Sequence, residues 1–142
     1  MTWKIEIKLP RDRTQPGELV LTVDGRKRLM AICLGMADPE LWKWNHTFDP
    51  LLPDGHMPTG VFSAQFDSAQ AHLELRGVSG DAAVAQANHR IMWIVGGAPG
   101  FDPNIHGGLR PTAGSIRVYD ATMARIAELI EGPGVVEIAE VG

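Results

Sequence analysis

The sequence predicts a mostly β fold: a compact curved sheet or sandwich of short strands, with one main α-helix after Ser115. Apolar and polar residues alternate with a period of two in several short segments, as they do in half-buried strands. The segment after Ser115, in contrast, shows a clear helical period. The 16 glycines and 10 prolines in 142 residues mark many turns, which suits short strands better than long helices.

Length and composition indicate one globular domain spanning residues 1–142, without repeats or linkers. The formal net charge of -4 argues against nucleic acid or an anionic membrane as the main partner. No apolar run reaches the length of about 18 residues that a membrane-spanning helix needs. Because Met1 leads directly into a strand pattern, we expect no signal peptide, so the chain is made without one or begins after its removal.

The first third of the chain reads as three strands. Residues 3–9 and 19–23 alternate between apolar and polar side chains, and Asp24-Gly25 is a strong hairpin signal before a returning strand over residues 26–34. Cys33, the single cysteine, lies in an apolar run of that strand and excludes an internal disulfide. We expect it to be a packed core thiol.

Residues 35–60 form a long, proline-rich connection, in which a short helix over 38–44 is expected. Connections of this length usually carry function or cover another part of the structure. Trp42 and Trp44 make this one aromatic. Two interpretations stay open for them: they anchor the connection onto the sheet, or they belong to a lid that packs on a bound substrate.

The middle of the chain predicts a hairpin of strands over 61–66 and 71–76, in which Leu73 and Leu75 face the core and His72 faces solvent. Residues 81–87 are ambiguous between a short helix and a strand. The nearly continuous apolar run over 90–95 is typical of a buried central strand.

The last quarter of the chain predicts one amphipathic helix and a closing strand. Asp120 is a good helix N-cap, and Gly132-Pro133-Gly134 stops the helix before a strand over 135–138. The expected core stripe of the helix has the spacing i, i+3, i+4, i+7: Met123, Ile126, Ala127 and Ile130.

Two polar residues stand out between these elements. Ser115 follows Gly114, where the missing side chain lets a substrate approach the backbone. His106 lies nine positions earlier, and the intervening loop is long enough to bring the two side chains together. A hydroxyl or thiol beside a histidine base is the basic arrangement for nucleophilic catalysis.

These segments carry a resemblance to a known family. Ile105-His106-Gly107-Gly108 and Thr112-Ala113-Gly114-Ser115-Ile116-Arg117-Val118 resemble the signature of the L,D-transpeptidase (YkuD) catalytic domain, with Ser115 in place of the family's cysteine. The segment 56–62 and the closing helix and strand are also similar to the family. The spacing from His106 to Ser115 is shorter than usual, as in the L,D-transpeptidase-like antibacterial effectors of type VI secretion systems.

The resemblance implies two catalytic side chains and a site for the oxyanion. Ser115 stands at the position of the attacking nucleophile, and His106 at that of the base that takes its proton. The backbone N–H groups around Gly114 and Ser115 would form the oxyanion hole.

The resemblance also implies residues that contact the substrate. Gly107 and Gly108 leave room for the substrate backbone, and Trp42 and Trp44 are candidates to line the cleft. Arg117 matches the family arginine near the nucleophile. It either pairs with a stem-peptide carboxylate or braces the loop, and the sequence leaves both roles open.

Serine at position 115 weakens the expected activity. A thiol beside a histidine readily becomes the nucleophilic thiolate, whereas a serine hydroxyl needs its proton removed during attack. Three interpretations are open: a substitution introduced to inactivate the enzyme, a natural pseudoenzyme that only binds, and a working serine nucleophile.

The expected function is that of an L,D-transpeptidase-like enzyme acting on peptidoglycan stem peptides through an acyl-enzyme, inactive or weakly active with serine at position 115. The alternative is a catalytically silent module of the same fold that binds peptidoglycan or a partner, and an immunity protein is a candidate partner. Action in the periplasm or cell wall follows from the substrate; no cofactor, nucleic acid or membrane insertion is expected.

A metal site is a weaker rival, because its candidate ligands do not show the sequence spacing typical of metal-binding motifs. Those candidates are His46, His56 and His106 with Asp49, Asp54 or Asp102.

Overall fold

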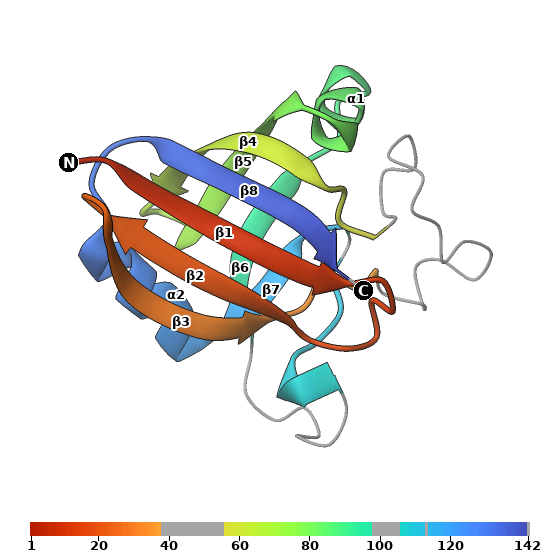
Figure 1. The fold of residues 1–142 in the computed structure, drawn as a ribbon, viewed down its shortest axis with the longest axis horizontal. Coiled ribbons are helices and arrows are strands. Elements are labelled where there is room, and N and C mark those ends of the chain that lie inside the picture. The colour runs from red at the N-terminus through yellow and green to blue at the C-terminus, as the bar shows by residue number, and fades with distance from the viewer. Residues whose placement is uncertain (38–55, 98–105, 113, 142) are drawn as a thin grey trace.

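The computed structural model describes residues 1–37, 56–97, 106–112 and 114–141, with only the backbone described for His106. These ranges form one eight-stranded sheet, two α-helices and a short 3-10 helix (Figure 1). The strands are β1 (Trp3–Pro10), β2 (Gly17–Val23), β3 (Arg26–Cys33), β4 (Gly60–Asp67), β5 (His72–Ser79), β6 (Met92–Gly97), β7 (Ile116–Tyr119) and β8 (Gly134–Val141). The helices are α1 (Asp81–Ala87), α2 (Asp120–Leu129) and the 3-10 helix η1 (His106–Gly108). The predicted mostly β class is confirmed.

The strands follow the order β3-β2-β1-β8-β4-β5-β6-β7 in a single curved sheet. Neighbouring strands are antiparallel except for the parallel pairs β1–β8 and β6–β7. Beyond the end of β3, Leu34 exchanges two backbone hydrogen bonds of 2.9 Å with Arg117 on the opposite edge strand. The two edges of the sheet therefore meet, and the sheet is nearly closed.

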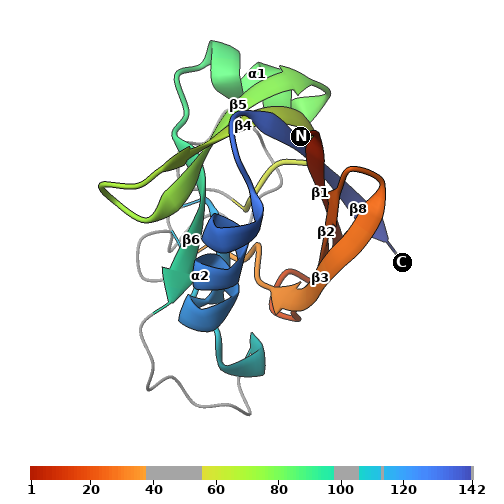
Figure 2. The ribbon, with the colours of Figure 1, turned by 90° about the vertical axis from the view of Figure 1, so that its left-hand side faces the viewer.

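The core lies inside this curved sheet. Ile5 and Ile7 of β1 are fully buried, as their alternation with charged residues predicts. Figure 2 shows α2 between the β4–β6 side of the sheet and the β1–β3 side, where it packs against β3, β6 and β7. Its buried residues are Thr122, Met123, Ile126 and Leu129.

Several details of the final helix differ from the prediction. The N-cap is Tyr119, and Asp120 occupies the first helical position, where its carboxylate still complements the helix dipole. The helix ends at Leu129, so Ile130 follows it, and Ala127 is only half-buried. The core-facing stripe is therefore rotated slightly from the predicted one.

Two local predictions from the first third of the chain are confirmed. Asp24 and Gly25 both have positive φ, 49° and 81°, as a two-residue turn between β2 and β3 requires. Cys33 is fully buried in the core. Burial, assisted by the negative charge of Glu18, raises the pKa of its thiol to about 12, so the thiol stays protonated at neutral pH.

Two predictions for the middle of the chain are wrong. His72 is buried, with 3% of its surface exposed, because the ring of Trp93 from β6 stacks on it. The strand predicted to be central, β6, lies next to the edge strand β7. The ambiguous segment 81–87 is the helix α1, which packs on β5 and β4.

Some predictions concern residues outside the described ranges. These are the short helix over 38–44 and the placement of Trp42 and Trp44. Among the described helices, none combines the length and the apolar composition needed to cross a membrane.

Candidate active site

Ser115 lies immediately before β7, with 7% of its surface exposed. The backbone N–H of Trp93 donates to its Oγ at 3.0 Å. The parallel pairing of β6 with β7 begins one residue later, at Ile94 and Ile116. The serine hydroxyl thus accepts a hydrogen bond from the residue just before the first β6 residue that pairs with β7, and this contact fixes its orientation.

The backbone of Ser115 is held by Thr112. The Ser115 N–H donates to Thr112 Oγ1 at 2.8 Å, and the Thr112 hydroxyl donates to the Ser115 carbonyl at 2.7 Å. Thr112 is itself anchored, because its N–H donates to the Met36 carbonyl at 3.2 Å. The N–H expected in the oxyanion hole already has a partner here, so a substrate oxygen would have to replace the Thr112 hydroxyl.

Arg90 is a functional candidate that the sequence analysis missed. Its guanidinium is buried and donates to the carbonyls of His56 at 3.0 Å and Gly114 at 3.2 Å. Gly114 has a φ of +90°, and a Cβ there would lie 2.6 Å from Arg90 Nη2. Glycine is therefore required at this corner both by the backbone conformation and by the arginine.

The buried Arg90 guanidinium contacts the carbonyl of Gly114, the residue before Ser115, and this contact has an electrostatic consequence. A positive charge favours the ionised form of a nearby thiol or hydroxyl. The N–H of Trp93, aimed at the same Oγ, acts in the same direction. The only signal for Arg90 in the sequence is a charged residue at the start of an apolar run, which is also typical of an ordinary strand end.

Arg117 is surrounded by backbone carbonyls. It donates to Gly96 at 2.6 Å, to Arg110 at 3.3 Å and, at the limit of a hydrogen bond, to Pro111 at 3.5 Å. Burial and the positive charge of Arg110 lower the pKa of Arg117, while Asp120 opposes them. These contacts are those of a brace between two loops, and a substrate carboxylate would have to compete with them.

The His-Gly-Gly segment lies at the other end of β7. Gly107, in η1, has a φ of +67°, and its carbonyl accepts a hydrogen bond from the Tyr119 hydroxyl. A Cβ on Gly107 would lie 3.0 Å from Ile32 Cδ1, so the turn also packs on β3. Tyr119 is four residues beyond Ser115, or roughly 13 Å along an extended strand.

The structure therefore places Gly114, Ser115 and Arg117 at or near the start of β7. Gly107 and Gly108 lie near its end, beside Tyr119. The distance from Ser115 to the His106 ring stays untested, because that side chain lies outside the described part of the chain. For the metal rival, only His56 has a described side chain. Its Nδ1 accepts the Ala37 N–H at 2.9 Å and so is occupied.

No protein-family model matches the chain, and a search of curated proteins finds no match either. The resemblance to L,D-transpeptidases consequently rests on the motif residues themselves.

Proposed function

We propose that this chain is an L,D-transpeptidase-like domain that acts on peptidoglycan stem peptides, with Ser115 at the nucleophile position. The observation that carries the proposal is the corner formed by Gly114 and Ser115. There, the Arg90 guanidinium holds the carbonyl before Ser115, and the Trp93 N–H points at its Oγ. Such a corner stabilises negative charge on the side chain at position 115.

The reaction begins with attack of the position-115 side chain on the carbonyl of a peptide bond next to a D-amino acid. Its proton passes to His106, and the amine of the departing residue leaves with a proton. The acyl-enzyme is then resolved by an amine, which gives cross-linking or D-amino-acid exchange, or by water, which gives L,D-carboxypeptidase activity. A cysteine would enter this reaction as a thiolate, whereas Ser115 needs the base at the moment of attack.

A second function, stem-peptide binding without turnover, is favoured by the backbone hydrogen bond of Ser115. Its N–H, which an oxyanion hole would need, already donates to Thr112 Oγ1. Either way, we propose that the serine form binds stem peptides and turns them over slowly or not at all. The proposed place of action is the periplasm or cell wall, and an immunity protein is a proposed partner.

The test is the variant Ser115→Cys, which restores the family's nucleophile. We expect fast alkylation by iodoacetamide, because Arg90, the Trp93 N–H and His106 all favour a thiolate. We also expect an acyl adduct, detected by mass, with a tetrapeptide muropeptide. The parent protein should bind the same muropeptide with little or no adduct.

Two controls separate the site from background. Cys33 is buried and present in both proteins, so the parent reports alkylation at that thiol. The double variant Ser115→Cys/His106→Ala should lose the fast alkylation if His106 is the base. If the new thiol of Ser115→Cys reacts no faster than a free thiol and forms no adduct, a disarmed transpeptidase is excluded. Muropeptide binding by that same protein would then identify the silent binding module.

A further inference from the structure

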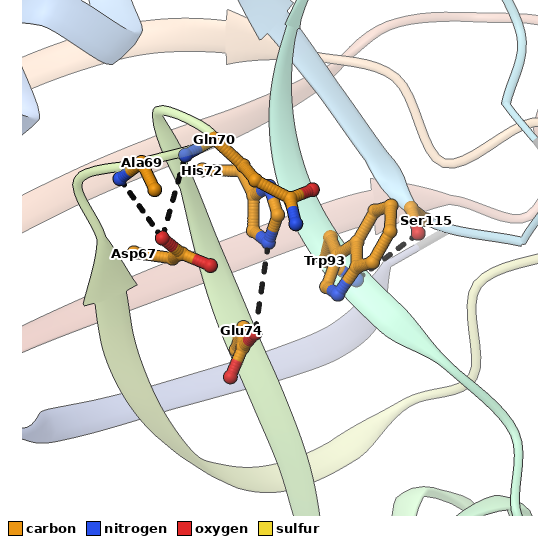
Figure 3. Close-up of polar contacts among 7 residues, drawn as sticks. All are labelled: Asp67, Ala69, Gln70, His72, Glu74, Trp93 and Ser115. Atoms are coloured by element: carbon orange, nitrogen blue, oxygen red, sulfur yellow. Dashed lines mark hydrogen bonds and ion pairs between the residues drawn. The ribbon is translucent and has the colours of Figure 1, made fainter.

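The β4–β5 hairpin brings together three side chains that can bind metal ions. Asp67 pairs with His72 across the two antiparallel strands, and Glu74 lies two residues further along β5 on the same face. One ligand atom from each residue lies within 4.8 Å of the others. Figure 3 shows the three side chains converging beside the turn.

His72 has a buried nitrogen that the described residues leave without a hydrogen-bond partner. The residue is 3% exposed, and its Nε2 lacks a partner among them. The closest acid is Glu74, whose Oε1 lies 3.9 Å away, too far for a hydrogen bond. A buried polar atom without a partner is destabilising, so this nitrogen is a candidate ligand atom for a metal ion.

The His72 ring is held in a fixed orientation. It stacks on the Trp93 indole with ring centroids 4.3 Å apart and planes 24° from parallel. In Figure 3 its Nε2 points toward Glu74. An imidazole that is already oriented loses little conformational freedom when it binds a ligand.

Asp67 is oriented by the turn that follows it. Its Oδ1 accepts the backbone N–H groups of Ala69 at 2.9 Å and Gln70 at 3.3 Å. Figure 3 shows the other carboxylate oxygen directed toward His72 and Glu74. Glu74 has an exposed side chain and is free to rotate toward the other two, which closes the ligand set.

We propose that Asp67, His72 and Glu74 bind a divalent transition-metal ion of the Zn²⁺ type. One imidazole nitrogen and two carboxylate oxygens form a mixed nitrogen and oxygen set that suits Zn²⁺ and its neighbours. Mg²⁺ and Ca²⁺ prefer oxygen ligands alone. The ion would cross-link β4 to β5 beside the turn, and water would complete its coordination. This site is independent of the function proposed for Ser115.

The experiment uses the full chain without a histidine tag, stripped of metal and titrated with Zn²⁺ by calorimetry. We expect one ion per chain and a rise of the melting temperature with Zn²⁺. A second titration with Cu²⁺, which quenches nearby indoles, should lower the fluorescence of Trp93 because its ring stacks on His72. The variant Trp93→Phe should lose that part of the quenching.

Three variants assign the ligands. His72→Phe keeps an aromatic ring against Trp93 and removes the nitrogen, so Zn²⁺ affinity should fall at least tenfold. Asp67→Asn keeps an oxygen that can accept the two turn N–H groups, and Glu74→Gln removes the charge and replaces one carboxylate oxygen by an NH2 group; both should weaken binding. Glu18→Gln, an exposed acid on β2, which β1 and β8 separate from the hairpin, is the matched control and should bind like the parent.

Each outcome of these titrations either supports or overturns the proposed metal site. Stoichiometric binding that is lost in His72→Phe and kept in Glu18→Gln supports the site. Binding of equal strength in the parent and in His72→Phe would assign the ion to another histidine and overturn the proposal. Absence of binding at a Zn²⁺ concentration of about 1 mM would overturn it as well. Circular dichroism of each variant verifies that it is folded.

Discussion

The Ser115 corner and the β4–β5 hairpin both contact Trp93, but they differ in whether their buried polar groups have hydrogen-bond partners. At the corner, the N–H, the carbonyl and the Oγ of Ser115 all have protein partners, supplied by Thr112 and Trp93. At the hairpin, the buried Nε2 of His72 has no hydrogen-bond partner among the described residues, and the nearest carboxylate oxygen, Glu74 Oε1, lies 3.9 Å from it.

The contrast separates two kinds of polar residue. A network of satisfied hydrogen bonds stabilises the backbone around a site, and it depends on particular residue types such as Gly114. A buried polar atom that lacks a partner gains a bond only when a ligand arrives. We therefore expect substitutions at the corner to reduce stability, and substitutions at the hairpin to affect mainly the binding of a ligand.

The largest effect is expected for Arg90→Leu. Two buried carbonyls, of His56 and Gly114, would lose a charged donor. At about 1–3 kcal/mol for each of the two buried groups left unsatisfied, the free energy of unfolding should fall by about 2–6 kcal/mol. Urea denaturation measures this, with the exposed Arg76→Leu as control. A loss no larger than that of the control would mean that the corner does not depend on the buried cation.

A smaller loss is expected for Ser115→Ala. This variant removes the acceptor of the Trp93 N–H but leaves the Ser115 backbone bonds to Thr112 intact. The free energy of unfolding should decrease by about 1–3 kcal/mol, against almost no change for the exposed Ser79→Ala. If Ser115→Ala were as stable as the parent, the hydroxyl would have no structural role, and a purely catalytic one would gain support.

The smallest effect should have the opposite sign. In metal-free protein, His72→Phe removes a buried nitrogen without a partner among the described residues and retains a ring against Trp93. We expect unfolding to require about 1 kcal/mol more than in the parent. Thermal melts in the presence of a chelator test this. A clear loss of stability would indicate that His72 is already satisfied in the apo protein, which would remove the contrast between the two regions.

Local patterns in the sequence were sufficient for most of the secondary structure. The Asp24-Gly25 turn, the hairpin of β4 and β5, and the helix after Ser115 follow from turn chemistry and from periodicities of 2.0 and 3.6 residues. The buried state of Cys33 follows from its apolar neighbours. The Gly114-Ser115 corner was likewise visible, because a glycine just before an apolar strand segment marks a place where the backbone turns sharply.

Only the tertiary structure decided which strands pair and which polar residues lie inside. The parallel pairing of β1 with β8 joins the two ends of the chain, and no local pattern specifies it. His72 alternates correctly with Leu73, so the sequence placed it on the outer face of the sheet, but Trp93 from a neighbouring strand covers that face. Arg90 is buried for a similar reason, since its carbonyl partners come from residues 34 and 24 positions away. Periodicity tells which face of an element a side chain occupies, whereas burial depends on what the rest of the chain lays over that face.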